Sequence, residues 1–104
     1  MKITEVNLTP VHPKGGLVAF ASCVLDGNIY LSSIAVYVRP SGTYRLLYPA
    51  KKVGAINMDI FHPINRAASK EIEAAIIQKC NEVFDEKSYE VSENGHGQTS
   101  LLLR

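Results

Sequence analysis

The amino-acid sequence predicts an α+β domain in which an antiparallel β-meander of about four strands packs against one C-terminal amphipathic helix. The first 50 residues contain strand-forming runs separated by short turns, and residues 65–84 repeat apolar positions with a helical period. With 104 residues and no internal break in composition, the chain is long enough for one domain and hardly for two. We therefore expect a single domain over residues 1–84 and a polar tail over residues 85–104.

Four segments of the first half have the composition of strands. The first alternates apolar and polar residues until Pro10 and Pro13 interrupt it, so we expect it to end near there. The second is almost continuously apolar, as is typical of a central strand covered on both faces. The sequence Asp26-Gly27-Asn28 tolerates positive φ and favours a tight hairpin. The expected strands are ITEVNLTPV (3–11), LVAFASCVL (17–25), IYLSSIAVYV (29–38) and YRLLYP (44–49).

The second half contains one amphipathic helix that we expect to lie across one face of the sheet. Its apolar stripe comprises Ile72, Ile76, Cys80 and Val83 or Phe84. Asn65 is the expected N-cap, because its side-chain oxygen can accept a hydrogen bond from a first-turn amide. Glu71 and Glu73 are expected early enough in the helix to favour its dipole. In the tail, TSLLL (99–103) is a candidate for a short extra strand.

Composition, cysteine spacing and histidine spacing limit the expected location of the protein and the ligands it could bind. The N-terminus lacks the apolar run of a signal peptide, and no apolar stretch approaches the roughly 20 residues of a membrane span, so a cytoplasmic protein without a membrane partner is expected. Cys23 and Cys80 form no C-x-x-C motif and are predicted to be reduced core residues. His12, His62 and His96 have no metal-ligand spacing, and the sequence suggests no cofactor and no small-molecule substrate.

The net charge of +1 conceals an asymmetry along the chain. Residues 1–70 carry eight basic groups against three acidic ones, a net +5, whereas residues 71–104 carry three against seven, a net −4. Such a separation can leave one face positive enough to attract phosphates, although a solvated mixed surface is an equal alternative.

Two groups of basic residues are the candidates for phosphate contacts. The segment AKKVG (50–54) is interpreted as a loop that presents Lys51 and Lys52. Arg66 and Lys70 are four residues apart at the start of the predicted helix, where free amides could also receive an anionic oxygen. Arg45, with Tyr44 and Tyr48, could add stacking surface for unpaired bases. The alternative for the tyrosines is packing in the core or in a dimer interface.

The segment DIFHPIN (59–65) joins the two halves and allows two interpretations. His62 could act as a general acid or base oriented by Asp59, but no nucleophile motif accompanies it. Alternatively, Pro63 fixes an extended entry that Asn65 converts into a capped helix, so that His62, Pro63 and Asn65 form a structural hinge. In this preferred interpretation His62 is partly buried and bonded to backbone, and Ile60 and Ile64 point into the core.

The sequence YPAKK (48–52), followed by DIFHPIN and an amphipathic helix, resembles the SpoVG (stage V sporulation, septation protein G) family. The resemblance extends to the ITEV opening and to Leu25-Asp26, so it covers about residues 2–84. It implies a small bacterial cytoplasmic domain that dimerises and binds DNA, and RNA as a second ligand, as a regulator without enzymatic activity. Residue by residue, it assigns the basic step to Lys51 and Lys52 and the hinge to His62, Pro63 and Asn65.

Three functions follow as hypotheses. The favoured one is a homodimeric nucleic-acid-binding regulator that uses Lys51, Lys52, Arg66, Lys70 and Arg45. The second is a protein-interaction module that pairs strands edge to edge with another partner. The third is a small enzyme of unrecognised type, for which no constellation of residues argues. The apolar second and third strands predict the dimer independently of the resemblance, because one helix can cover only one face of the sheet.

Overall fold

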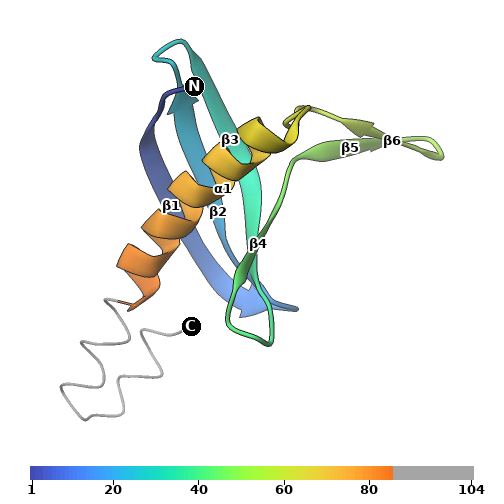
Figure 1. Ribbon diagram of the computed structural model, residues 1–104. Coiled ribbons are helices and arrows are strands. Elements are labelled where there is room, and N and C mark those ends of the chain that lie inside the picture. The colour runs from blue at the N-terminus through green and yellow to red at the C-terminus, as the bar shows by residue number, and fades with distance from the viewer. Residues whose placement is uncertain (86–104) are drawn as a thin grey trace.

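The computed structural model describes residues 1–85, so the predicted tail from residue 86 onward and its candidate strand TSLLL lie outside the described residues. The described part is the predicted α+β fold: an antiparallel sheet with strand order β1-β2-β3-β4 and one helix, α1, lying diagonally across one face (Figure 1). A second, two-stranded sheet, β5-β6, extends away from this body. The strands are β1 (Ile3–Lys14), β2 (Leu17–Leu25), β3 (Ile29–Val38), β4 (Tyr44–Leu47), β5 (Ala50–Val53) and β6 (Ile56–Asp59).

The sheet is a meander whose turns follow the local sequence. Asp26 and Gly27 have φ of +51° and +68°, as the two central residues of a type I′ hairpin turn require. Strand β1 continues past Pro10 to Lys14, so the expected end near Pro10 was wrong. Proline is tolerated there because β1 is an edge strand, and a missing N–H on its open side breaks no ladder.

One face of the sheet forms the core with α1 (Arg66–Cys80), which continues into the π-helical turn η1 (Asn81–Asp85). The predicted apolar stripe of the helix is confirmed, since Ile72, Ile76 and Cys80 are all buried. The opposite face is not covered by any described element, and Phe20 there is 39% exposed. The expectation that β2 is covered on both faces was therefore wrong for the single chain. The buried cluster comprises Ala19, Ala21, Ile34, Val36, Ile72, Ile76 and Cys80.

Both cysteines are free thiols buried in the body. Burial raises the pKa of Cys80 to about 11 and also raises the pKa of Cys23. Both side chains are therefore protonated at neutral pH and pack as small hydrophobic groups, as predicted. Among the described residues, no helix is long and apolar enough to cross a membrane.

The segment that was expected to be a loop is the hairpin β5–β6. Gly54 has a φ of +64°, as the first central residue of a type II′ turn requires, and Lys51 pairs with Met58 while Lys52 pairs with Asn57. The N–H of Ile60 donates to the carbonyl of Pro49 at 3.0 Å, which extends the ladder one step beyond β6. We call residues 49–60 the arm. It makes no substantial contact with the sheet or the helix and projects from the body (Figure 1).

Candidate nucleic-acid interface

The start of α1 is built by the sequence that precedes it. Asn65 is the N-cap, with extended φ and ψ of −149° and 164°, and the Ala68 N–H donates to its Oδ1 at 2.8 Å. The Ser69 N–H donates to the Asn65 carbonyl at 3.1 Å. The amides of Arg66 and Ala67 lie ahead of this first helical bond and remain available to a ligand. The helix therefore begins with an ordered cap and two unused donors.

The first turn of α1 is cationic. It contains Arg66 and no acidic residue, so Glu71 and Glu73 are too far along the helix for the dipole contribution expected of them. A cation at the positive end of a helix dipole is unfavourable by itself, and an anion bound beside it compensates both charges. This arrangement favours an anionic ligand over solvent at the helix start.

A shallow hollow of about 490 Å³ lies against this turn. Its polar helical residues follow the spacing i, i+3, i+4, i+7, which places them on one face of α1. The Ser69 hydroxyl donates to Glu73 Oε2 at 3.3 Å, so the carboxylate at the far end of the hollow is partly engaged. The lining residues are Pro63, Ile64, Asn65, Arg66, Ser69, Lys70 and Glu73. The structure thus brings Arg66 and Lys70 together with two of the hinge residues.

The other predicted basic residues lie elsewhere. Lys51 and Lys52 are on β5 and do not line the hollow, and because they are adjacent in a strand their side chains leave opposite faces of the arm. Arg45 lies on β4, with its guanidinium 5.4 Å from the centroid of the Tyr37 ring. Its neighbours Tyr44 and Leu46 pack toward the core, so Arg45 is on the sheet face opposite α1. The five basic residues therefore occupy three separate places.

The two tyrosines proposed for base stacking are core residues. Tyr44 stacks on Phe84 with ring centroids 6.2 Å apart, and Tyr48 meets Phe61 edge-on at 6.1 Å. The Tyr48 hydroxyl is buried without a hydrogen-bond partner among residues 1–85. Burial, with smaller contributions from the charges of Glu73 and Cys23, raises the pKa of Tyr48 to about 12. Packing in the core is thus the correct interpretation for both rings.

The hinge segment is more exposed than expected. His62 Nδ1 lies 2.9 Å from the Pro63 carbonyl and its Nε2 lies 3.5 Å from Asp59 Oδ2, but the His62 side chain is 48% exposed. Ile60 and Ile64 are 62% and 87% exposed, so their predicted place in the core was wrong. Phe61 is the residue of this segment that packs against the core. The open setting of the His62–Asp59 pair gives no enclosed site for acid–base chemistry.

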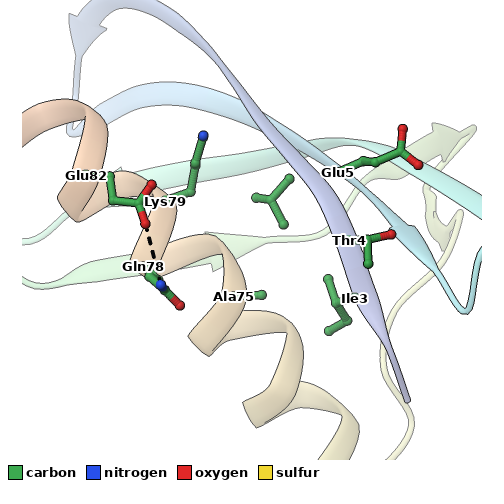
Figure 2. Close-up of a pocket in the computed structure, with 8 residues that line it drawn as sticks. Ile3, Thr4, Glu5, Ala75, Gln78, Lys79 and Glu82 are labelled. Atoms are coloured by element: carbon green, nitrogen blue, oxygen red, sulfur yellow. Dashed lines mark hydrogen bonds between the residues drawn. The ribbon is translucent and has the colours of Figure 1, made fainter.

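A second hollow, of about 300 Å³, lies between β1 and the other end of α1 (Figure 2). It accompanies an irregularity in β1, where Glu5 has a φ of +51° and the β1–β2 register shifts between Thr4 and Asn7. Glu82 and Lys79 line it from the helical side, and the Gln78 amide donates to Glu82 Oε2 at 3.5 Å; Glu5 also lines it, but its carboxylate points away from the helix (Figure 2). The Glu82 carboxylate beside Lys79 disfavours phosphate here. Among residues 1–85, no group of three or more His, Cys, Asp or Glu side chains could hold a metal ion.

The sequence predicted the cationic start of the helix but not the hollow beside it or all of the residues that line the hollow. Ser69 and Glu73 were absent from the predicted site, although their spacing from Arg66 places them on its helical face. The hairpin was also missed. The sequence VGAINMDI (53–60) could have indicated it, because apolar residues alternate with other residues after the two-residue turn at Gly54 and Ala55.

Comparisons with a family model and with individual proteins agree on one family. The family model SpoVG matches residues 1–82. A protein of Finegoldia magna named "Putative septation protein SpoVG" is 37% identical over 89 residues, covering 85% of this chain and 82% of that protein. Proteins of the same name from Clostridioides difficile and Bacillus subtilis are 31% and 27% identical, covering 81% and 91% of this chain and 91% and 98% of their own lengths. The chain therefore belongs to the SpoVG family.

Proposed function

We propose that this protein is a homodimeric regulator that binds DNA, with RNA as the second candidate, through contacts to phosphate. The observation that supports this most is the cationic first turn of α1, where Arg66 and Lys70 line an open hollow beside two unused amides. A phosphate oxygen in this hollow would accept hydrogen bonds from the amides and pair with both side chains. The names of the relatives suggest septation as the process in which this binding acts.

The arm adds a second basic element to the proposed interface. Lys52 shares its face with Asn57, and both side chains are exposed. Phosphate contacts fix the position of a protein on nucleic acid without distinguishing bases. Contacts from the helix start and from the arm would therefore set an orientation on the backbone, and the proposal includes no cofactor and no small-molecule substrate.

A salt titration of binding tests the proposal directly. We expect the wild-type protein to bind a mixed-sequence duplex DNA, or an RNA of equal length, with an affinity that falls steeply between about 50 and 200 mM salt, because bound phosphates release counterions. The double change Arg66→Gln and Lys70→Gln should weaken binding by about tenfold or more. It should also flatten the slope of log affinity against log salt by about one unit for each phosphate that the variant no longer neutralises.

Lys79→Gln is the control, because it removes one positive charge, against two in the double change, from the last turn of the same helix, beside the second hollow. It should leave both affinity and slope nearly unchanged. Replacing Lys51 and Lys52 together with alanine should weaken binding by a similar factor on every sequence tested, with thermal stability nearly intact. Equal effects of the Arg66/Lys70 double change and Lys79→Gln would remove the helix start from the interface.

The competing function is a protein-interaction module that acts by strand pairing. The exposed apolar residues of the arm favour it, because such a surface suits a protein partner better than a phosphate backbone. This candidate predicts no salt-dependent binding to either nucleic acid. The titration above therefore separates the two functions without a partner being known.

A further inference from the structure

The sheet face that α1 leaves uncovered carries two aromatic rings and a guanidinium. Side chains alternate between the two faces of a strand, and residues paired across antiparallel strands share a face. Because Ala19 and Ala21 are buried in the core with the helix, Phe20 between them projects from the open face. The pairings of β2 with β3 and of β3 with β4 place four further residues there. We call the set the platform; it comprises Phe20, Ala35 and Leu47 in one row and Tyr37 and Arg45 in the next.

The platform presents flat groups to solvent. Phe20 and Leu47 are 39% and 47% exposed, and Ala35 between them is too small to separate them. The Arg45 guanidinium lies 5.4 Å from the centroid of the Tyr37 ring, so the cation and the ring form a layered pair. Phe20 and Tyr37 are diagonal neighbours, about 7–8 Å apart along the two strands. Aromatic rings and guanidinium planes at such a spacing are the surfaces on which splayed, unpaired bases stack.

The charge of the sheet suits a phosphate backbone beside these groups. Strands β2, β3 and β4 contain no acidic residue, and the one acidic residue of β1, Glu5, lies at the opposite end of the sheet from Arg45. Leu17 links the second row to β1, since it pairs with Tyr37 on one side and with Lys14 on the other. This row therefore carries a cation on each outer strand of the sheet, Lys14 on β1 and Arg45 on β4.

We infer that the platform binds single-stranded RNA, whose unpaired bases stack on Phe20 and on the Arg45–Tyr37 pair. The phosphates between these bases lie beside Lys14 and Arg45. The inference rests on the nucleic-acid binding of the proposed function and adds a second site to it, on the sheet face opposite α1. Duplex DNA offers the platform no free base faces, because its bases are already stacked on one another. Duplex phosphates at the helix start and unpaired bases on the platform are thus separate ligands of one protein.

Hydroxyl groups beside the platform favour RNA over single-stranded DNA. Thr9 pairs with Phe20 across β1 and β2, so its hydroxyl lies on the same face next to the ring. Ser22 follows Phe20 by two residues in β2 and adds a second hydroxyl to this face. A ribose 2′-OH donates and accepts hydrogen bonds, and it is the group by which a protein distinguishes RNA from DNA. Both hydroxyls are placed to exchange hydrogen bonds with the ribose of a base stacked on Phe20.

An introduced fluorophore tests stacking at the platform itself. The chain contains no tryptophan, so a single indole reports only on its own surroundings. In Phe20→Trp, an oligouridine of about 12 nucleotides should quench the indole emission, because uracil stacks on the ring. Tyr30→Trp is the matched control, since Tyr30 is 67% exposed on the same face but pairs with Val24 at the end of the sheet near Glu5. Emission from Tyr30→Trp should remain unchanged.

Binding measurements separate stacking from packing. Phe20→Leu keeps an apolar side chain but removes the ring, and should weaken oligouridine binding by about tenfold or more. Phe20→Tyr keeps the ring and should retain most of the wild-type affinity. Neither change should affect binding of a mixed-sequence duplex DNA. Thr9→Val should bring the affinity for oligouridine down toward that for an oligodeoxyuridine of equal length, since it removes the hydroxyl with little change of shape.

The outcomes distinguish this inference from the proposed function. Equal oligouridine binding by wild type and Phe20→Leu, or equal quenching of Phe20→Trp and Tyr30→Trp, overturns the platform and leaves the proposed function in place. Wild-type protein that binds oligodeoxyuridine as tightly as oligouridine overturns RNA as the ligand of the platform. A lower mass of Phe20→Leu than of wild type in sedimentation would assign this face to contacts between copies and also overturns the inference. Wild type that binds neither oligouridine nor duplex DNA overturns the proposed function as well.

Discussion

The body of the protein and the arm contain the same kinds of aliphatic residue in opposite environments. Ile34 and Ile76 in the body are fully buried between the sheet and α1, whereas Ile56 and Ile60 in the arm are 66% and 62% exposed. The body is thus stabilised by contacts that this chain makes with itself. The arm has a regular ladder and a suitable turn but no core of its own. Its residues make physical sense only with a further surface in contact.

The largest effect that this difference predicts is on stability. Ile76→Ala should lower the free energy of unfolding by about 2–5 kcal/mol, because it leaves a cavity in a packed core. Ile64→Ala makes the same change at a residue that is 87% exposed and lies outside the arm, and should cost no more than about 0.5 kcal/mol. Urea unfolding followed by circular dichroism measures both. Similar losses for the two variants would contradict the division into a packed body and an exposed connection.

A smaller effect is expected where the two regions join. Asn65→Ala should cost about 1 kcal/mol of stability, since the Ala68 amide loses the side-chain oxygen that it donates to at 2.8 Å. Asn65→Asp keeps an acceptor at the cap and should preserve most of that stability. Nucleic-acid binding per folded molecule should barely change in Asn65→Ala, whereas Asn65→Asp adds a negative charge to the lining of the hollow and should weaken phosphate binding. A stable Asn65→Ala protein that had lost binding would instead make this side chain part of the phosphate site.

The same comparison explains which features the sequence could predict. The stripe Ile72, Ile76 and Cys80 could be predicted because apolar residues repeat with the helical period where a helix packs on its own chain. The turn at Asp26-Gly27 could be predicted because a tight turn depends only on the backbone conformations of neighbouring residues. In contrast, Ile60 and Ile64 were placed in the core because apolar residues are usually buried within their own chain. Both residues are exposed in the part of the chain that the structure describes, and a single sequence contains no direct signal that separates an exposed apolar residue from a buried one.

Only the helical part of the candidate site was predicted, because only that part depends on local sequence spacing. Arg66 and Lys70 were grouped correctly because four residues along a helix fix their relation locally. Lys51 and Lys52 were assigned to the same function, and their segment AKKVG (50–54) was interpreted as a loop. Once that segment forms a hairpin, its own ladder carries the lysines away from the helix start and turns them to opposite faces. The position of the lysines relative to the helix start therefore depended on the secondary structure of the arm.

The last effect is a dependence of body stability on alkaline pH. The pKa of Cys80 is about 11 in the folded protein against an ordinary value of 9.0, because burial disfavours the thiolate. Between these values the unfolded chain releases a proton that the folded chain keeps, so stability is complete below pH 9 and falls as the pH rises toward 11. Tyr48 acts in the same direction between 10 and about 12.

Urea midpoints measured from pH 8 upward for wild type, Cys80→Ala and Tyr48→Phe separate these contributions. Each variant should show a shallower alkaline decline than wild type, even if its stability at pH 8 is lower, because one group that ionises only on unfolding has been removed. Lys52→Ala, in the arm, leaves both buried groups in place and should keep the wild-type difference between pH 8 and pH 10. A Cys80→Ala protein with the full wild-type decline would mean that this thiol ionises as readily in the folded body as in the unfolded chain.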